Sequence, residues 1–289
     1  MSKQIQWYPG HMFKAKKEII AQLKTIDLVV EIIDARVPLS SHNEMLEEIT
    51  QYKPKLIVFS KADLVNPAEL KKYKEHYENL GYTTIEANLK NAQGNTKVKK
   101  KIQEVSKHIT DKYQAKGINK VIRVLVMGMP NVGKSTFINF MLNSKKTKIG
   151  NRPGVTRQQQ WVRLDRDIEL LDTPGILVPK ISNEASGFNL VLCSLIKDEV
   201  VPKDDVAVYM LNYLVKNHPA VLKSRYGLVI EDVEDIDYEQ VYETIARRIG
   251  ALMRGNEADY ERVTNVIIND FRNQKFGNLI LDEQLKTTV

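Results

Sequence analysis

The chain opens with apolar residues spaced as on one face of a helix, and then alternates short apolar runs with helical patterns. In residues 11–24, Ala15, Ile19 and Leu23 form an apolar stripe and the lysines lie mostly off it, which predicts an amphipathic helix. Apolar runs of strand length follow at 28–34, 55–60, 82–87 and 121–127, and helical patterns at 42–52, 66–81, 95–116 and 134–142. This alternation predicts an α/β fold with a mostly parallel sheet covered on both faces.

The pattern changes near residue 180. Residues 158–164 and 168–172 predict one more pair of strands. Beyond them the helical patterns at 204–218, 238–255 and 260–277 follow one another without a strand pattern of comparable strength, and the last two end at glycine. The sequence therefore predicts an α/β domain over residues 1–180 and a small, all-helical domain over residues 181–289.

Composition and charge are typical of a globular protein with a polyanionic partner. Of 289 residues, 43% are hydrophobic and 27% are charged, which is enough for a sizeable core. The net charge of +7 is uneven, because residues 1–180 hold 31 Lys and Arg against 18 Asp and Glu, whereas residues 181–289 hold 12 against 18. Residues 95–123 are the most basic stretch. Nucleic acid is the favoured partner of such a surface, although any single lysine run can also be an ordinary solvated helix face.

Cysteine usage and hydropathy indicate the compartment. Cys193 is the only cysteine, so the chain forms no internal disulfide, which fits a reducing compartment. Its apolar surroundings predict a buried side chain. The first residues lack a signal-peptide pattern, and the apolar runs are too short to cross a bilayer. We expect a cytoplasmic protein with no membrane partner.

A phosphate-binding loop follows the predicted strand 121–127. The stretch GMPNVGKS has the form G-x-x-x-x-G-K-S, and a strand before it and a helix after it supply the expected context. Glycines let backbone N–H groups face the phosphates, the lysine reaches the β- and γ-phosphates, and the serine ligates Mg²⁺. The predicted phosphate-binding residues are Gly128, Met129, Pro130, Asn131, Val132, Gly133, Lys134, Ser135 and Thr136.

A second motif, LLDTPG, ends the predicted strand 168–172. Asp172 is placed to hold the Mg²⁺ shell, and the N–H of Gly175 can meet the γ-phosphate. In the intervening loop, Thr156 of RPGVT is a candidate second hydroxyl ligand of Mg²⁺. These stretches resemble the first three motifs of translation-factor-class GTPases.

The base-reading motif of such GTPases, N/T-K-x-D, occurs upstream as SKAD after the strand 55–60. Asp63 can accept hydrogen bonds from the guanine N1–H and amino group, and Lys61 can lie along the base. Ser60 departs from the usual Asn or Thr but keeps a hydroxyl. After the next predicted strand, Asn88 and Leu89 stand where the weak fifth motif falls.

The motif order is fourth, fifth, first, second, third, as in a circularly permuted GTPase. With WYPGHM, DARVP and DTPGIL, the chain resembles the ribosome biogenesis GTPase A family of bacteria over nearly its whole length. The resemblance implies a cytosolic factor that binds GTP and GDP, assembles the large ribosomal subunit and contacts rRNA through its helical domain. Residues 181–289 are net negative, so we assign bulk attraction to rRNA to the basic first domain.

The catalytic residue is the least conventional part of the prediction. Ile176 and Leu177 follow the DTPG motif, where GTPases usually carry a water-orienting Gln. The resemblance implies that His11 takes this role. Asn131 either helps to hold a K⁺ ion beside the phosphates or is simply a polar loop residue. Arg36 of DARVP either pairs within the fold or approaches the nucleotide.

The sequence predicts a GTPase whose hydrolysis is stimulated by the large subunit and coupled to release. The alternatives are a nucleotide-gated rRNA-binding scaffold with little hydrolysis, or a permuted GTPase that acts on another RNA such as tRNA. Guanosine tetraphosphate is a candidate inhibitor of the same site.

Overall fold

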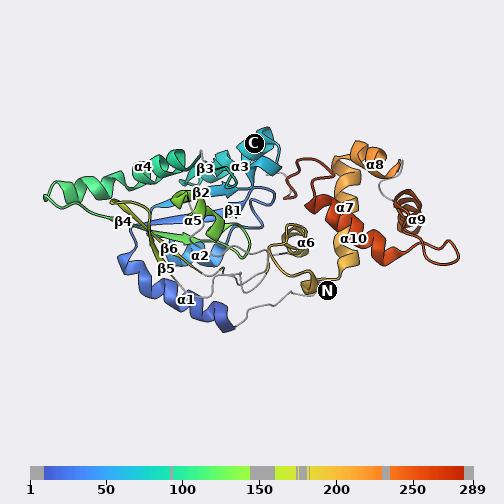
Figure 1. The fold of residues 1–289 in the computed structure, drawn as a ribbon, viewed down its shortest axis with the longest axis horizontal. Coiled ribbons are helices and arrows are strands. Elements are labelled where there is room, and N and C mark those ends of the chain that lie inside the picture. Colours follow the sequence, from blue (N-terminus) through green and yellow to red (C-terminus); the bar gives the residue numbers. More distant parts are fainter. Residues whose placement is uncertain are drawn as a thin grey trace.

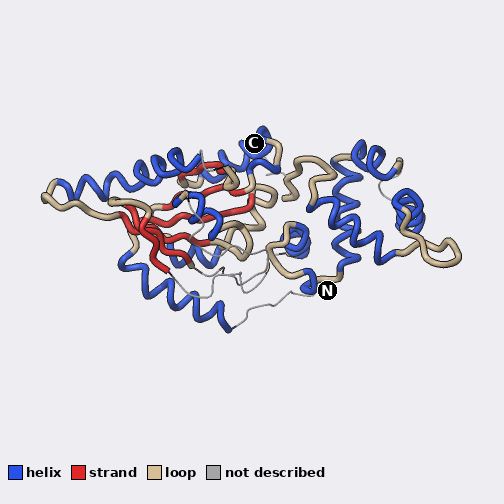
Figure 2. Tube along the Cα trace, in the orientation of Figure 1, coloured by secondary structure: helices blue, strands red, loops and turns tan. Residues whose placement is uncertain are grey.

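The computed structural model describes residues 10–91, 94–143, 160–173, 175, 181, 183–229 and 235–282, with only the backbone for residues 10–15. Its centre is a six-stranded sheet in the order β3-β2-β1-β4-β6-β5, drawn in red in Figure 2. All neighbours are parallel except the edge pair β5–β6. The strands are β1 (Leu28–Asp34), β2 (Lys55–Ser60), β3 (Thr83–Ala87), β4 (Ile122–Met127), β5 (Gln160–Arg163) and β6 (Ile168–Asp172).

Helices cover both faces of the sheet because its central strands are apolar on both sides. On one face, Val30 and Ile32 of β1 belong to a cluster that includes residues of α4 (Asn95–Gln114) and α5 (Lys134–Leu142). On the other face, Val29 packs with residues of α1 (Gly10–Gln22) and α2 (Glu44–Thr50), and Ile33 with residues of α3 (Pro67–Asn79). In Figure 1 the sheet lies between α4 above and α1 below.

A group of helices follows the sheet in the chain and lies beyond one end of it, and α6 is the member of this group nearest the strands (Figure 1). The apolar cluster under α4 and α5 continues into these helices without a break. They are α6 (Glu184–Leu192), α7 (Lys203–Asn217), α8 (Pro219–Tyr226), α9 (Tyr238–Ile249) and α10 (Tyr260–Arg272), and short 3₁₀ turns occur at Leu23–Thr25, Ala62–Leu64 and Asp198–Val200.

The segment after α10 returns to the sheet. Ile280 packs in the cluster beneath α3, and the Tyr73 hydroxyl donates to the carbonyl of Asp282. The Asp282 carboxylate accepts hydrogen bonds from the amides of Leu39 and Ser40, at 2.5 and 3.0 Å. The C-terminal end of the described chain is therefore fixed to α3 and to the loop that follows β1.

The structure corrects several predicted helices. The pattern over 238–255 predicts one helix, but α9 ends at Ile249, because Gly250, with a φ of +70°, stops the helix five residues before Gly255. The pattern over 260–277 likewise overshoots the end of α10, and α6 and α8 were not predicted. Cys193 is buried, as predicted. Among the described residues, no helix is both long and apolar enough to cross a membrane.

Candidate nucleotide site

The carboxyl ends of the five parallel strands bring the predicted motifs to one edge of the sheet. SKAD follows β2, Asn88 and Leu89 follow β3, the phosphate loop follows β4, and Asp172 ends β6. Strand β1, which ends at Asp34, lies between β2 and β4. In open parallel sheets the crevice outside these strand ends is where ligands bind. We call this edge, with the loops that leave it, the nucleotide edge.

The phosphate loop approaches β1 so closely that only glycine fits at its first position. A Cβ on Gly128 would lie 2.5 Å from the carbonyl oxygen of Ile32, and the φ of +144° also disfavours a side chain. The Lys134 ammonium donates to the carbonyls of Gly128 and Met129, at 3.1 and 2.7 Å. Burial lowers the pKa of Lys134 to about 8, although the Asp172 carboxylate opposes the shift. The ammonium therefore lies within the loop that would surround the phosphates.

The DTPG motif lies against the same loop. A Cβ on Gly175 would lie 2.7 Å from Cα of Pro130 and 3.0 Å from Nζ of Lys134. Asp172 is buried at the end of β6, and the hydroxyl of Thr173 donates to the carbonyl of Val126 on β4. This contact fixes the start of the motif beside the phosphate-loop strand.

The residues predicted to hold Mg²⁺ fit that ion by their chemistry. Asp172 supplies a carboxylate, and Ser135 supplies a hydroxyl from the first turn of α5. Mg²⁺ prefers such oxygen ligands together with substrate phosphates, and in GTPases it neutralises charge on the β- and γ-phosphates. Thr156, the third predicted ligand, lies outside the described residues.

The base-reading loop touches the phosphate loop directly. The Ser60 hydroxyl lies 2.6 Å from the carbonyl of Val132 and 3.0 Å from that of Ile33. A serine thus reaches the phosphate loop in the position where the motif usually has Asn or Thr. Leu89 lies beside Gly133, where a Cβ would be 3.3 Å from Cδ1 of Leu89. The Lys90 ammonium lies 3.5 Å from the Asp63 carboxylate, so the loops after β2 and β3 meet.

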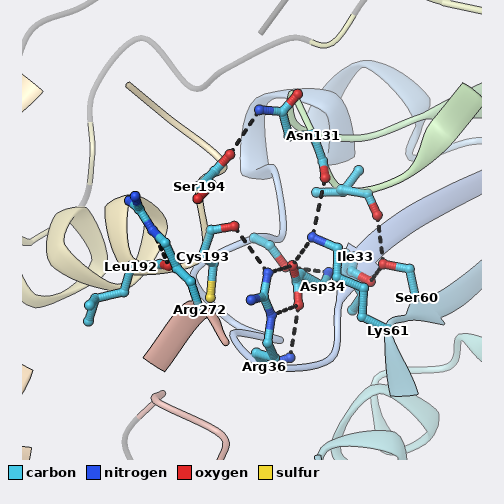
Figure 3. A network of polar contacts seen from close by, with 12 residues as sticks. Ile33, Asp34, Arg36, Ser60, Lys61, Asn131, Leu192, Cys193, Ser194 and Arg272 are labelled. Carbon is cyan, nitrogen blue, oxygen red and sulfur yellow. Dashed lines mark hydrogen bonds and ion pairs between the residues drawn. The ribbon is translucent and has the colours of Figure 1, made fainter. Parts of the chain in front are cut away.

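Sequence reasoning missed Asp34, which occupies the centre of this edge (Figure 3). Its carboxylate is fully buried and accepts two hydrogen bonds from the Arg36 guanidinium, at 3.0 and 2.8 Å. It also accepts one from the Lys61 ammonium at 2.6 Å. Burial would raise the pKa of Asp34, but the two cations outweigh it and hold the pKa well below its usual value. Arg36 therefore pairs within the fold, and the acidic residue two positions earlier was the available signal.

Asn131 and Arg36 also contact the end of α6. The Asn131 amide donates to the carbonyl of Ser194 at 2.8 Å, and Arg36 donates to the carbonyl of Cys193 at 3.0 Å. Both contacts link residues far apart in the sequence, which no local pattern could predict. His11 falls in the first turn of α1, and its side chain lies outside the described residues.

A second polar cluster, on the other face of β1, has the spacing of a metal site. Ligand atoms of Glu31, His42 and Glu47 lie within 4.8 Å of one another. The Lys55 ammonium, however, pairs with the Glu47 carboxylate and lies 3.8 Å from that of Glu31. A built-in cation thus takes the place that a metal ion would need. We call Glu31, His42, Glu47 and Lys55 the α2 cluster.

Comparison with known proteins identifies the family. Residues 10–182 match the family model of RsgA GTPase, and residues 123–246 match that of 50S ribosome-binding GTPase. The proteins named ribosome biogenesis GTPase A in Bacillus licheniformis and Bacillus pumilus are 44% and 42% identical, and each alignment covers 96% of this chain and 98% of the relative.

The crystal structure of GNP-bound YlqF from T. maritima has a similar fold, with a TM-score of 0.62 and 22% identity over 94% of this chain and 98% of that one. At that identity the likeness concerns the fold alone, whereas the relatives above 40% identity extend over almost the full length of this chain. The chain is therefore a GTPase, and it belongs to the ribosome biogenesis GTPase A family.

Proposed function

We propose that this protein is a GTP-hydrolysing assembly factor for the large ribosomal subunit, with hydrolysis stimulated by the subunit and coupled to release. The observation that carries the proposal is the meeting of phosphate, base-reading and DTPG motifs at one sheet edge, next to the end of α6. The name of the relatives and the family description 50S ribosome-binding GTPase support the ribosomal partner.

In this proposal the nucleotide edge binds GTP and GDP through the residues predicted from the sequence. Lys134 transfers its hydrogen bonds from the loop carbonyls to phosphate oxygens, which are stronger acceptors because they are charged. Asp63 accepts from the guanine N1–H and amino group. When GTP is bound, the N–H of Gly175 donates to the γ-phosphate, and this hydrogen bond is absent with GDP. The bound nucleotide therefore determines whether the protein is in the conformation that binds the large subunit.

The surface offered to rRNA is the basic side of the α/β region. Lys74 of α3 and Lys97, Lys100 and Lys101 of α4 line a shallow cavity of about 250 Å³ beside the edge strand β3. Glu86 and Glu104 offset part of this charge. Phosphate contacts from such lysines add affinity without reading base sequence. We further propose that residues 181–289 form a helical domain that makes the more specific contacts with rRNA in a cytoplasmic pre-ribosomal particle.

The catalytic part of the proposal concerns the N-terminal arm. His11 orients the attacking water, because Ile176 and Leu177 provide no hydrogen-bonding group after the DTPG motif. Asn131 holds a K⁺ ion beside the phosphates through its side-chain oxygen, so single-turnover rates are expected to be higher in K⁺ than in Na⁺. Guanosine tetraphosphate competes for the guanine and phosphate positions, so it is expected to lower the stimulated rate.

Single-turnover hydrolysis, with and without purified large subunits, tests the function. We expect the subunit to accelerate wild-type hydrolysis by about a hundredfold or more, which is the contribution of a correctly positioned acid–base group such as His11. His11→Ala is expected to bind GTP normally and lose most of that acceleration. His76→Ala, on α3, is the matched control and should behave as wild type.

The outcomes separate the alternatives. Tight subunit binding with no acceleration indicates a scaffold that seldom hydrolyses GTP. Acceleration by tRNA but not by subunits indicates a different RNA partner. Equal acceleration of wild type and His11→Ala leaves the function standing and removes His11 from catalysis.

A further inference from the structure

The turn that ends α6 is held by side chains from three separate parts of the chain. The last carbonyls of a helix have no partner within it, and its negative dipole end favours cations. The last turn of α6 contains no basic residue of its own. Arg272 of α10 donates to the carbonyls of Val191 and Leu192, at 2.7 and 3.3 Å. Arg36 and Asn131 take the next two carbonyls, those of Cys193 and Ser194 (Figure 3).

Arg36 bonds both the end of β1 and the turn after α6. Its guanidinium grips both oxygens of Asp34, and the same Nη2 atom that bonds Asp34 also donates to the carbonyl of Cys193. The side chain is 7% exposed, so water does not compete effectively for these contacts. A planar guanidinium can make this fork and a third bond together, whereas the ammonium of a lysine is a point charge without that geometry.

Asp34 in turn contacts Lys61 of the base-reading loop. Its Oδ2 atom accepts from the Lys61 ammonium, which also lies 3.3 Å from the carbonyl of Asn131 in the phosphate loop. Lys61 has a φ of +55°, so its backbone is in the left-handed region as it leaves β2. The orientation of the Asp34 carboxylate, which Arg36 fixes, therefore determines where the Lys61 ammonium lies.

We propose that Arg36 is a positioning residue for guanine binding: it holds Lys61 in place through Asp34, and it does so when the α6 turn is docked on its guanidinium. The inference rests on the proposed guanine site at Lys61 and Asp63. Coupling between two sites is reciprocal, so docking of the turn raises nucleotide affinity and bound nucleotide stabilises the docked turn. Any change that removes the α6 turn from Arg36 would therefore weaken GDP binding.

The first test measures GDP affinity and GDP release from the full-length protein. Arg36→Lys keeps the positive charge but loses the paired hydrogen bonds to Asp34. We expect GDP affinity to fall about tenfold because GDP is released faster. This change is within the usual range of coupling between sites. The control is Arg225→Lys, because Arg225 forms a similar two-bonded pair with Asp270 in the helical region. This control should bind GDP as wild type does.

Arg36→Lys in a Lys61→Ala background tests whether Arg36 acts on GDP binding through Lys61. If Arg36 acts through Lys61, Arg36→Lys should change GDP affinity less than about twofold once Lys61 is absent, since the two effects are then not additive. A full additional tenfold loss would overturn the positioning role. If Lys61→Ala alone leaves GDP affinity unchanged, Lys61 does not contribute to binding and the route from Arg36 through Lys61 is wrong. Failure of the guanine site itself is a distinct result, since it would appear as unchanged GTP affinity in Asp63→Asn.

Hydrogen exchange tests the link to α6. The amides of Ser194 and Leu195 donate to carbonyls within the turn, at 2.9 and 2.8 Å, so their exchange reports whether the turn is formed. We expect GDP to slow exchange in residues 190–196 by about threefold or more in the wild type, and not in Arg36→Lys. If GDP leaves the exchange rate of residues 190–196 unchanged in the wild type, or slows it equally in Arg36→Lys, the α6 turn and the nucleotide site are not coupled through Arg36.

Discussion

Two buried carboxylates on strand β1 lie three residues apart and hold together different parts of the molecule. Glu31 is within the strand and faces α2, and its carboxylate lies 3.0 Å from His42, just before α2, and 3.8 Å from Lys55, at the start of β2. Asp34 ends the strand at the nucleotide edge and meets Arg36 and Lys61. Each carboxylate is fully buried with two basic partners, so the local chemistry of the two sites is nearly the same.

Their pKa values shift in the same direction for the same reason. Burial raises the pKa of each carboxyl, and the neighbouring basic groups outweigh it, His42 first for Glu31 and Arg36 first for Asp34. A perturbed carboxylate is therefore not by itself a mark of a functional site. What distinguishes Asp34 is its position at the carboxyl end of a parallel strand, where its partners belong to the loops that we propose to bind the nucleotide. Glu31 instead fixes α2 to the sheet.

The comparison predicts that substitutions at the nucleotide edge change ligand binding and leave folding almost intact. Asp63→Asn should lower GTP affinity about a thousandfold, because two charge-assisted hydrogen bonds to the base are lost. Affinity for xanthosine triphosphate should rise, since its base offers a carbonyl to the new amide. Competition binding with both nucleotides, together with urea unfolding, measures the effect.

Lys90→Met is the control for Asp63→Asn, because Lys90 is the charged partner of Asp63 in the free protein. This variant should retain guanine preference. Unchanged GTP affinity in Asp63→Asn, or an equal loss in Lys90→Met, would show that the base is read elsewhere.

At the α2 cluster the opposite pattern is expected. Glu31→Gln leaves Lys55 and His42 without one buried negative partner, so the free energy of unfolding should fall by about 3 kcal/mol, as for other broken buried ion pairs. GDP affinity should stay within about twofold, since the two sites share no partner. Urea unfolding and GDP titration give the two values.

Glu75→Gln removes an exposed pair with Lys71 on α3 and should cost no more than about 0.5 kcal/mol. If Glu31→Gln instead weakened GDP binding as strongly as it weakened folding, the division between the two regions of β1 would be wrong.

Much of the α/β region could be predicted because its signals are local. Strand ends were predicted to within a residue or two, since apolar runs bounded by turns mark them directly, and the phosphate loop carries its own spacing. The helical region was harder. The apolar stretch around Leu190 and Cys193 gave no helical period because α6 is buried on nearly all sides, and Gly250 and Gly255 are equally good helix stops by composition.

The candidate site could be predicted only in its motifs. Asp63, Lys134 and Asp172 each follow from a short pattern, and their assignments to base, phosphate and metal remain predictions. The contacts of Arg36 with Cys193 and of Asn131 with Ser194 depend on tertiary packing between segments 157 and 63 residues apart. A single sequence contains no signal for such pairs.

The smallest expected effect is a change in proton binding. It distinguishes the buried basic groups of the two regions, because the pKa of His42 is raised and that of Lys134 is lowered. Nearby carboxylates, chiefly Glu31, raise the pKa of His42 above 6.5 despite burial, so its contribution to stability is present below pH 6.5 and is lost as pH rises through the raised value. Burial lowers the pKa of Lys134 to about 8, so its charged form is penalised in the folded protein below that pH, and the penalty disappears as pH rises toward 10.5.

Phosphate binding reverses the penalty on Lys134, because a bound anion stabilises the ammonium. Because the pKa of Lys134 in the free protein is lowered to about 8, binding of GDP with Mg²⁺ should take up part of a proton at pH 8 and less at pH 7. Calorimetry in two buffers of different ionisation enthalpy measures this uptake. GDP affinity should correspondingly fall as pH rises above 8, whereas Glu31→Gln should show the same proton uptake as wild type. Binding at pH 8 without proton uptake would mean that Lys134 is already fully charged in the free protein and that its burial does not penalise the ammonium.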